Sequence, residues 1–260
     1  MLVTGAARGQ GRNHCVRMAE EGADVIALDR CGPEPAVSYS MPDPDDLAET
    51  VSLVEATGRR CVGTIADVRD EAAMIDAISR AVAELGRLDT VVANAGICAV
   101  SRWDELRIAD FRSILDVNLT GAWCTATASI PHLLAAGGGS LLFVSSAAGL
   151  RGLPFFAAYS ASKQGLSGLM ESLALELAES SVRVNTIHPT GVATVMTSGL
   201  SGLGDAIARQ PQTAPLFENS LPMATVEMDD ISAAVIFLAS DQARAITGLK
   251  MSVDAGMSIR

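Results

Sequence analysis

The amino-acid sequence predicts an α/β protein in which helices cover both faces of a doubly wound parallel sheet, the Rossmann fold. Short apolar segments alternate with longer helical patterns along the chain, as in βα units. A glycine-rich turn lies between the first strand and the first helix. Polar residues follow several of the apolar segments, which is expected where the carboxyl ends of parallel strands meet at one edge of a sheet.

Hydrophobic periodicity predicts the elements in chain order. After a first strand that ends near Thr4, continuous apolar runs predict strands buried on both faces at 25–28, 61–65, 90–93, 141–144 and 182–187. Helical patterns are predicted at 10–21, 45–56, 71–85, 109–136 and 159–179. No linker or change of composition divides the chain, so residues 1–260 are predicted to form one domain.

Composition excludes several classes of protein. The net charge of −11 argues against nucleic acid and anionic membranes, because binding to both depends on Lys and Arg. Residues 117–150 carry no formal charge, but Pro131 and a run of three glycines break the stretch, so no transmembrane span is predicted. Five cysteines without a CxxC pair indicate a reducing compartment, and the expected location is cytoplasmic. The three histidines lack metal-ligand spacing, so no metal site is predicted.

Two predicted helices are apolar or weakly charged on nearly every side, at 118–136 and 159–179. A helix that is apolar all round is buried on both sides. One side can pack on the sheet and the other on a second subunit, which predicts a homo-oligomer. The alternative is a self-contained monomer core.

The glycine-rich turn reads Gly5-Ala6-Ala7-Arg8-Gly9-Gln10-Gly11, with GxxxGxG spacing. Glycines at such a turn let the backbone approach a pyrophosphate, which then lies on the helix N-terminus. The predicted contacts are Gly5, Arg8, Gly9, Gln10 and Gly11. A turn without a ligand is the simpler interpretation of this motif alone.

Asp29 ends the next predicted strand. A carboxylate there accepts hydrogen bonds from a ribose 2′-hydroxyl and repels a 2′-phosphate, so NAD is predicted rather than NADP. The adjacent Arg30 is a second candidate contact and weakens that preference. A simple strand-end cap is the alternative for Asp29.

Two further strand ends are expected at the same edge of the sheet. Asp67 and Val68 follow the strand at 61–65, and Asp67 is expected to meet the adenine amino group. Asn94, Ala95 and Gly96 follow the strand at 90–93 and are expected to line the adenosine ribose. Taken singly, each group is an ordinary turn.

Tyr159 and Lys163 are spaced i and i+4, one above the other on a helix face. A neighbouring ammonium favours the phenolate form, so Tyr159 can act as general base toward an alcohol or general acid toward a ketone. Ser146 ends the strand before this helix and can hold the substrate oxygen. Asn118 is a poor helix former inside a helix, which indicates a functional position. Tyr and Lys at this spacing often pair on a solvated helix face, so the motif is specific only in combination with the others.

In combination, these motifs resemble the short-chain dehydrogenase/reductase family along essentially the whole chain. The resemblance implies about seven parallel strands and tetrameric assembly. It implies that Tyr159 is the acid/base, that Lys163 also holds the nicotinamide ribose, that Ser146 polarises the substrate oxygen and that Asn118 anchors a water. The segment at 188–191 resembles the family's Pro-Gly motif, which makes Pro189, Gly191, Val192 and Thr194 expected nicotinamide contacts. The closing strand and turn are expected at 253–256.

A narrower resemblance is to the mycofactocin-coupled, carveol-dehydrogenase-like members. It rests on the turn from Gly5 to Arg12 and on a long proline-bearing segment after Asp29. Gly191 and Ala193 stand where those relatives tend to have Ser and Asn. An apolar substrate pocket is also expected, and it indicates a hydrophobic secondary alcohol, cyclic or terpenoid, as substrate.

The substrate pocket is expected to be apolar. Its predicted residues are Ser146, Leu153, Phe156, Tyr159 and Met196, with a lid at about 195–222. Two other functions stay open at this point. The first is a 3-oxoacyl-thioester reductase of the same family, which would need a basic patch to bind a phosphopantetheine carrier. The second is a non-enzymatic regulator that binds NAD with the same fold but catalyses no reaction.

The insertion at about 30–46 is much longer than an ordinary βα loop. Pro33, Pro35, Pro42 and Pro44 stiffen it, and Asp43 is expected to cap the next helix. Because it leaves from Asp29, the insertion is expected to fold over the dinucleotide, and the resemblance to the mycofactocin-coupled group implies a cover that slows release of the cofactor. A separate redox partner of the mycofactocin type would then reoxidise the bound NAD. A mobile surface insertion is the alternative.

Overall fold

The computed structural model describes residues 1–260 and contains one parallel sheet of seven strands in the order β3-β2-β1-β4-β5-β6-β7. The predicted fold class is therefore confirmed. The strand order reverses between β1 and β4, and ligands of such sheets bind at this point, beyond the carboxyl ends of the strands. The strands are β1 (Leu2–Thr4), β2 (Val25–Asp29), β3 (Cys61–Ile65), β4 (Thr90–Ala93), β5 (Gly139–Val144), β6 (Val182–Pro189) and β7 (Lys250–Val253).

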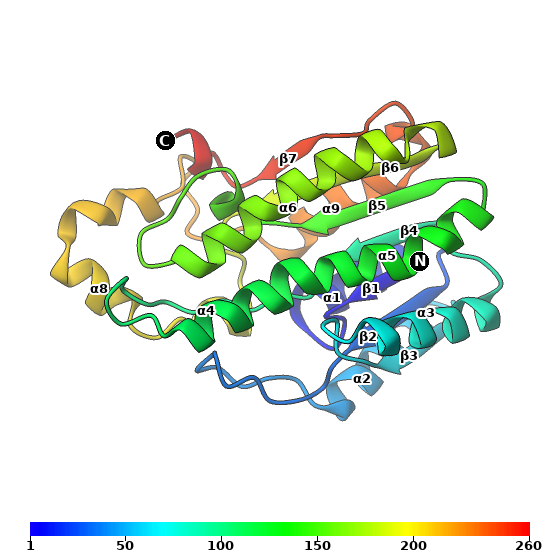
Figure 1. Ribbon diagram of the computed structural model, residues 1–260, viewed down its shortest axis with the longest axis horizontal. Coiled ribbons are helices and arrows are strands. Elements are labelled where there is room, and N and C mark those ends of the chain that lie inside the picture. Colours follow the sequence, from blue (N-terminus) through cyan, green and yellow to red (C-terminus); the bar gives the residue numbers. More distant parts are fainter.

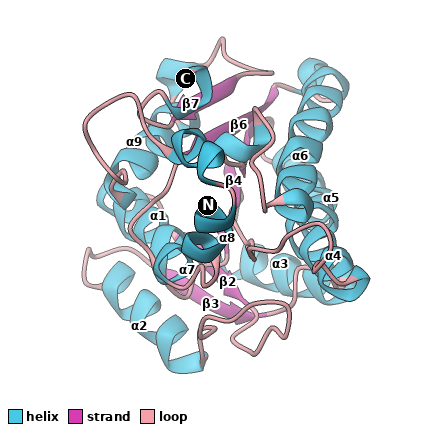
Figure 2. Ribbon diagram, turned by 90° about the vertical axis from the view of Figure 1, so that its left-hand side faces the viewer, coloured by secondary structure: helices cyan, strands magenta, loops and turns pink.

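Helices cover both faces of the sheet, which appears nearly edge-on in Figure 2. On one face lie α1 (Gly9–Glu20), α2 (Pro44–Glu55) and α9 (Met228–Ala239). On the other lie α3 (Glu71–Leu85), α4 (Ile108–Leu115), α5 (Gly121–Ala135) and α6 (Ala157–Glu176). Successive strand residues enter opposite cores: Leu2 and Ile26 pack in one, Val3 and Val25 in the other. This explains why the strands are apolar without alternation.

The predicted long helix at 109–136 is continuous from α4 to α5 but contains a π-helical turn at Asp116–Thr120. The sequence pattern did not reveal this turn, which carries Asn118. π-helical turns widen a helix by one residue and occur often at functional sites. The predicted strands at 61–65 and 90–93 and the predicted helix at 71–85 have the observed bounds, and the other predicted helices and strands are present with shifted ends. Helix α9 was not predicted, and β7 begins earlier than the closing strand and turn expected at 253–256.

The insertion after β2 and the predicted lid at 195–222 both lie beyond the carboxyl ends of the strands. Residues 30–43 have no regular structure and end where Asp43 caps α2, accepting from the backbone N–H groups of Asp45 (2.9 Å) and Asp46 (3.0 Å). The predicted cap is confirmed, and the insertion ends at 43 rather than 46. The segment 195–222 contains α7 (Val195–Ser198), α8 (Leu203–Arg209) and a 3₁₀ helix at Pro211–Phe217. In Figure 1, α8 lies at the left, away from the body of the sheet. None of the helices combines the length and apolarity that a membrane span requires.

Candidate active site

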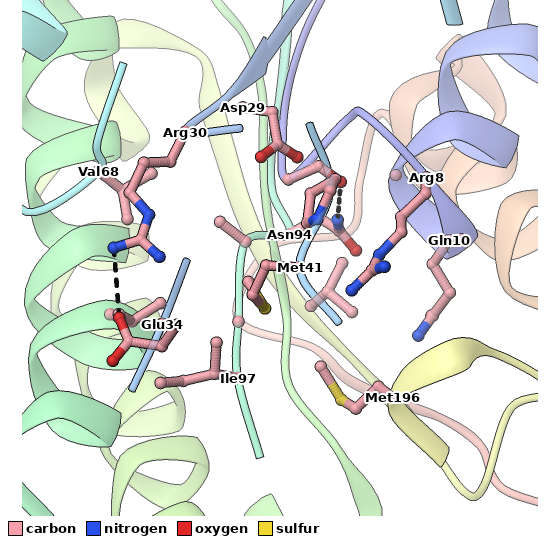
Figure 3. A pocket seen from close by; sticks show the side chains of 18 of the residues that line it. Arg8, Gln10, Asp29, Arg30, Glu34, Met41, Val68, Asn94, Ile97 and Met196 are labelled. Carbon is pink, nitrogen blue, oxygen red and sulfur yellow. Dashed lines mark hydrogen bonds and ion pairs between the residues drawn. The ribbon is translucent and has the colours of Figure 1, made fainter. Parts of the chain in front are cut away.

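A pocket lies across the carboxyl edge of the sheet, where the strand order reverses. Figure 3 shows Arg8 and Gln10 on one side of it and Arg30 and Glu34 on the opposite side, with Asp29 and Met41 between them. The structure brings sixteen of the predicted residues into its lining: Gly5, Arg8, Gly9, Gln10, Gly11, Asp29, Arg30, Asp67, Val68, Asn94, Ala95, Gly96, Tyr159, Lys163, Thr194 and Met196.

The glycine-rich turn requires glycine at three positions, at two of them for backbone conformation and at one of them for space. Gly5 and Gly9 have φ angles of +67° and +57°, which favour glycine. A Cβ on Gly11 would lie 2.0 Å from the carbonyl oxygen of Gly5, so α1 can start this close to β1 only with glycine. Helix α1 also begins without a side-chain cap, so its first N–H groups lack side-chain acceptors. Together these features form an anion-binding turn.

Asp29 is buried at the end of β2. Its carboxylate accepts hydrogen bonds from the backbone N–H groups of Ala7 (3.0 Å) and Cys31 (3.1 Å). It therefore caps the strand end and ties the glycine-rich turn to the start of the insertion. It also lines the pocket, so the capping role and a ligand role are compatible.

An ionic cluster centred on the buried Glu34 lies at the Arg30 side of the pocket. The Glu34 side chain is only 3% exposed and pairs with Arg30 (3.3 Å) and Arg69 (3.2 Å). Ser113 of α4 donates a hydrogen bond to the other Glu34 oxygen (2.9 Å). Arg69 also pairs with Asp67 (2.6 Å). Burial acts to raise the pKa of the Asp67 carboxyl, but hydrogen bonds and charge from Arg69 outweigh it and the pKa is lowered.

Glu34 and Arg69 were not predicted as site residues from the sequence. The only signal for Glu34 was that it is the one acidic residue in an otherwise proline-rich and uncharged stretch from 31 to 42. Its partners lie on elements distant in sequence, and no local pattern reveals such pairs.

Tyr159 and Lys163 share one face of α6, with the Lys163 Nζ 5.7 Å from the centre of the Tyr159 ring. Burial lowers the pKa of Lys163 to about 8 and raises that of Tyr159, which a hydrogen bond with Ser146 partly offsets. Lys163 donates to the carbonyl oxygen of Val144 (2.8 Å). The ammonium thus lies over the ring and anchors α6 to the end of β5.

Asn118 is 1% exposed and has no contact with the pocket. Its Oδ1 accepts from the Ile97 N–H (2.8 Å), and its amide donates to the Ile97 carbonyl (2.9 Å) and to Ser162 (3.0 Å). It braces the backbone that follows Gly96. A Cβ on Gly96 would lie 3.3 Å from Lys163 Nζ and 3.4 Å from Asn118 Oδ1, so Gly96 lies between the two.

Six other predicted residues stand outside the pocket lining: Ser146, Leu153, Phe156, Pro189, Gly191 and Val192. Ser146 caps the short 3₁₀ helix at Ala147–Gly149, and its carbonyl bonds His188 Nδ1 (2.8 Å). Phe156 packs edge-on against Tyr159 and also contacts Phe217 in the 195–222 segment. The backbone at 191–192 pairs with Val226 instead of facing the pocket.

The insertion contributes Tyr39, Met41 and Pro42 to the pocket, and none of these was predicted. The hydroxyl of Tyr39 accepts a hydrogen bond from the Cys98 N–H (3.0 Å). Tyrosine occurs only twice in the chain, and that scarcity was the one available signal. Both tyrosines line the same pocket.

Known proteins that are similar to this chain include short-chain dehydrogenases and carveol dehydrogenases. The family model for the short chain dehydrogenase matches residues 1–204. A (-)-trans-carveol dehydrogenase of Rhodococcus erythropolis is 44% identical over 100% of this chain and 97% of its own. Among solved structures, a short chain dehydrogenase from Mycobacterium paratuberculosis bound to NAD has a TM-score of 0.98 at 45% identity, covering 100% of this chain and 97% of that one. Carveol dehydrogenase from Mycobacterium avium in complex with NAD has a TM-score of 0.93 at 40% identity, with the same coverage.

The family match spans the glycine-rich turn, the strand ends and the α6 helix, which are the parts that build the pocket. The curated relative and both structures extend the similarity to the whole chain. This protein belongs to the short-chain dehydrogenase/reductase family.

Proposed function

We propose that this protein is an NAD-dependent oxidoreductase that interconverts a hydrophobic, cyclic secondary alcohol and its ketone. The observation that carries the proposal is the single pocket that runs from the glycine-rich turn to Tyr159 and Lys163. The proposal is supported by relatives named carveol dehydrogenase, since carveol is a cyclic alcohol, and by two similar structures described as NAD complexes.

The residues of the pocket fit a dinucleotide. The glycine-rich turn and the first N–H groups of α1 would receive the pyrophosphate, and Gly11 lets α1 start directly against the Gly5 carbonyl, where a Cβ would clash. Asp29 would accept from a ribose hydroxyl and disfavour NADP. We assign the remaining contacts as follows: Arg30, Asp67 and Val68 at the adenine end; Asn94, Ala95 and Gly96 at the adenosine ribose; Lys163 at the nicotinamide ribose; and Thr194 at the nicotinamide. Pro189, Gly191 and Val192 stand outside the pocket lining, and we assign them to the nicotinamide only from the family's Pro-Gly motif.

The chemistry assigned to the chain is proton transfer. In alcohol oxidation, Tyr159 Oη takes the hydroxyl proton while Ser146 holds the same oxygen, and the carbinol C–H bond breaks to leave the ketone. When bound, NAD would supply the hydride acceptor, and the positive charge of its oxidised ring would favour the phenolate form of Tyr159. Lys163 and Asn118 hold the geometry around that hydroxyl. In ketone reduction the same proton returns from Tyr159.

A finer proposal concerns NAD release. The insertion is attached on both sides of the pocket: Glu34 joins Arg69 and Ser113, and Arg8 binds the Ser40 carbonyl. Ser38 bonds the Gly199 carbonyl (3.2 Å) and Ser201 (2.9 Å) in the opposite segment. We propose that these attachments keep NAD bound between turnovers and that a separate redox partner of the mycofactocin type reoxidises it.

The test begins with purified protein. Bound nucleotide is released by denaturation and quantified, and exchange is followed with isotopically labelled NAD. We expect copurified NAD, slow exchange, one turnover with a cyclic alcohol, and multiple turnovers once an artificial electron acceptor is added. Multiple turnovers with rapidly exchanging NAD would overturn the tight-binding part alone.

The alternatives have distinct outcomes in the same assay. Reduction of 3-oxoacyl thioesters in preference to cyclic ketones would favour the thioester reductase, although the net charge of −11 does not suit an acidic carrier. Binding of NAD without turnover of any alcohol or ketone would favour a regulator. Tetrameric assembly is part of the proposal, and a sedimentation experiment measures it.

A further inference from the structure

A second cavity, of about 280 Å³, lies between the insertion and the 195–222 segment. Its walls are formed by residues 35–38, 98–101 and 199–201, together with Leu106 and Asp110. The walls are mixed: Pro35, Val37 and Val100 are apolar, whereas serines and Asp110 contribute polar atoms. No function described above uses this cavity.

Tyr39 forms the partition between this cavity and the dinucleotide pocket. Tyr39 lines the pocket, whereas its neighbour Ser38 and two residues that it contacts, Cys98 and Gly199, line the second cavity. The Tyr39 hydroxyl is held by the Cys98 N–H (3.0 Å). A Cβ on Gly199 would lie only 2.5 Å from the Cβ of Tyr39, so the tyrosine packs directly on the backbone there.

The partition stands close to the reacting groups. Tyr39 and Tyr159 line the same pocket, and Cys98, which holds the Tyr39 hydroxyl, lies two residues after Gly96, where a Cβ would be 3.3 Å from Lys163 Nζ. Substrate bound at Tyr159 would therefore meet the Tyr39 ring on the side toward the second cavity.

We propose that Tyr39 sets the maximum size of the alcohol by separating the catalytic pocket from the second cavity. Removing the ring joins the two spaces, and the apolar branch of a larger cyclic alcohol then occupies the second cavity beside Val37 and Val100. This inference rests on the proposed oxidoreductase function and names Tyr39 as its specificity-determining residue.

The test compares cyclohexanol with 4-tert-butylcyclohexanol, which differ in bulk away from the carbinol. The kcat/KM of each is measured with an artificial electron acceptor, and the ratio of bulky to small substrate is the readout. We expect Tyr39→Ala to raise this ratio about tenfold, the scale of a few added apolar groups in a pocket. Tyr39→Phe keeps the ring, and the ratio should remain as in the wild type. Because the ratio compares two substrates on one enzyme, changes in NAD retention cancel.

Two further variants connect the effect to the cavity. Met41→Ala, in the same segment and pocket lining but outside the second cavity, should leave the ratio unchanged. Adding Val100→Trp to Tyr39→Ala refills the second cavity and should reverse the gain. If Tyr39→Ala does not fold, Tyr39→Leu gives the same comparison with less lost volume.

An unchanged or lower ratio in a folded, active Tyr39→Ala variant would overturn the inference. So would a gain that persists after Val100→Trp. Failure of the proposed function looks different, because wild-type protein would then oxidise neither alcohol. In that case calorimetry measures the dissociation constants of the two corresponding ketones, and their ratio replaces the ratio of kcat/KM. If this ratio is the same in the wild type and in Tyr39→Ala, Tyr39 does not determine substrate size.

Discussion

The pocket has two contrasting parts. The framework, formed by the strand ends and α6 and braced by the π-helical turn, is fixed by buried hydrogen bonds. Lys163 donates to the Val144 carbonyl, and Asn118 bonds the backbone N–H and carbonyl of Ile97 behind the pocket. The covering segments, 30–43 and 195–222, meet through partly exposed contacts such as Ser38 with Ser201. Chemistry requires fixed geometry, whereas exchange and selectivity require segments that can open. We therefore expect changes in the framework to alter the reaction rate, and changes in the covering segments to alter substrate selectivity and cofactor exchange.

The largest effect is expected at the framework. Tyr159→Phe removes the proton carrier and should lower the alcohol oxidation rate by roughly 10²–10⁴-fold, the usual contribution of general acid–base catalysis. Its NAD content should equal that of the wild type, since the ring remains. Single-turnover kinetics provide the measurement. Tyr39→Phe is the matched control, and a wild-type rate in Tyr159→Phe would remove the tyrosine from its assigned role.

The next effect belongs to the covering segments. Glu34→Ala leaves Arg30 and Arg69 without their buried partner and should detach the insertion. Release of NAD should then quicken by about tenfold, equal to about 1.4 kcal/mol, with little change in single-turnover rate. Exchange of labelled NAD measures this. The exposed Glu55→Gln is the control. If Glu34→Ala slows the single turnover and leaves NAD exchange unchanged, the insertion acts on the reaction rate and not on NAD release, which contradicts the roles given to the two parts.

Asp29 lies where the two parts meet. Wild-type protein should prefer NAD over NADP by at least about tenfold, or 1.4 kcal/mol, and Asp29→Ala should abolish most of that preference. The variant should also lose stability, because the N–H groups of Ala7 and Cys31 lose their acceptor. Nucleotide titrations with Asp76→Ala as a charge-matched control decide the point. If Asp29→Ala still prefers NAD over NADP, Asp29 caps the strand end but does not select the cofactor.

The smallest expected effect is a pH dependence of stability from Lys163. Burial lowers its folded-state pKa to about 8 from the ordinary value of 10.5, so between these values the unfolded chain binds more protons. Stability of the ligand-free protein should therefore rise with pH across this range relative to Lys163→Met, by about 1 kcal/mol between pH 7 and 9. Urea unfolding of both proteins at the two pH values measures it. The compared quantity is the stability of the wild type minus that of Lys163→Met. If it stays constant or falls as the pH rises, burial does not lower the pKa of Lys163.

Much of the fold follows from local sequence signals. The strand at 61–65 and the helix at 71–85 were predicted with their observed bounds, because apolar runs and helical periodicity are set by neighbouring residues. The π-helical turn around Asn118 and the helix α9 were not predicted. A π-helical turn depends on what packs around the helix, and its sequence pattern differs little from that of an α-helix.

The sequence alone determined the framework of this protein: the buried strands, the glycines that only a tight turn requires, and Tyr159 above Lys163 at one helical turn. Each depends on residues close together in the chain. Tertiary structure decided which of these groups meet. It placed Tyr39 and Glu34 in the pocket and left Ser146, Phe156 and Gly191 outside its lining. Their positions depend on contacts between residues such as Glu34 and Ser113, or Ser38 and Ser201, which are far apart in sequence. Such contacts arise from packing of the whole chain, and no local periodicity encodes them.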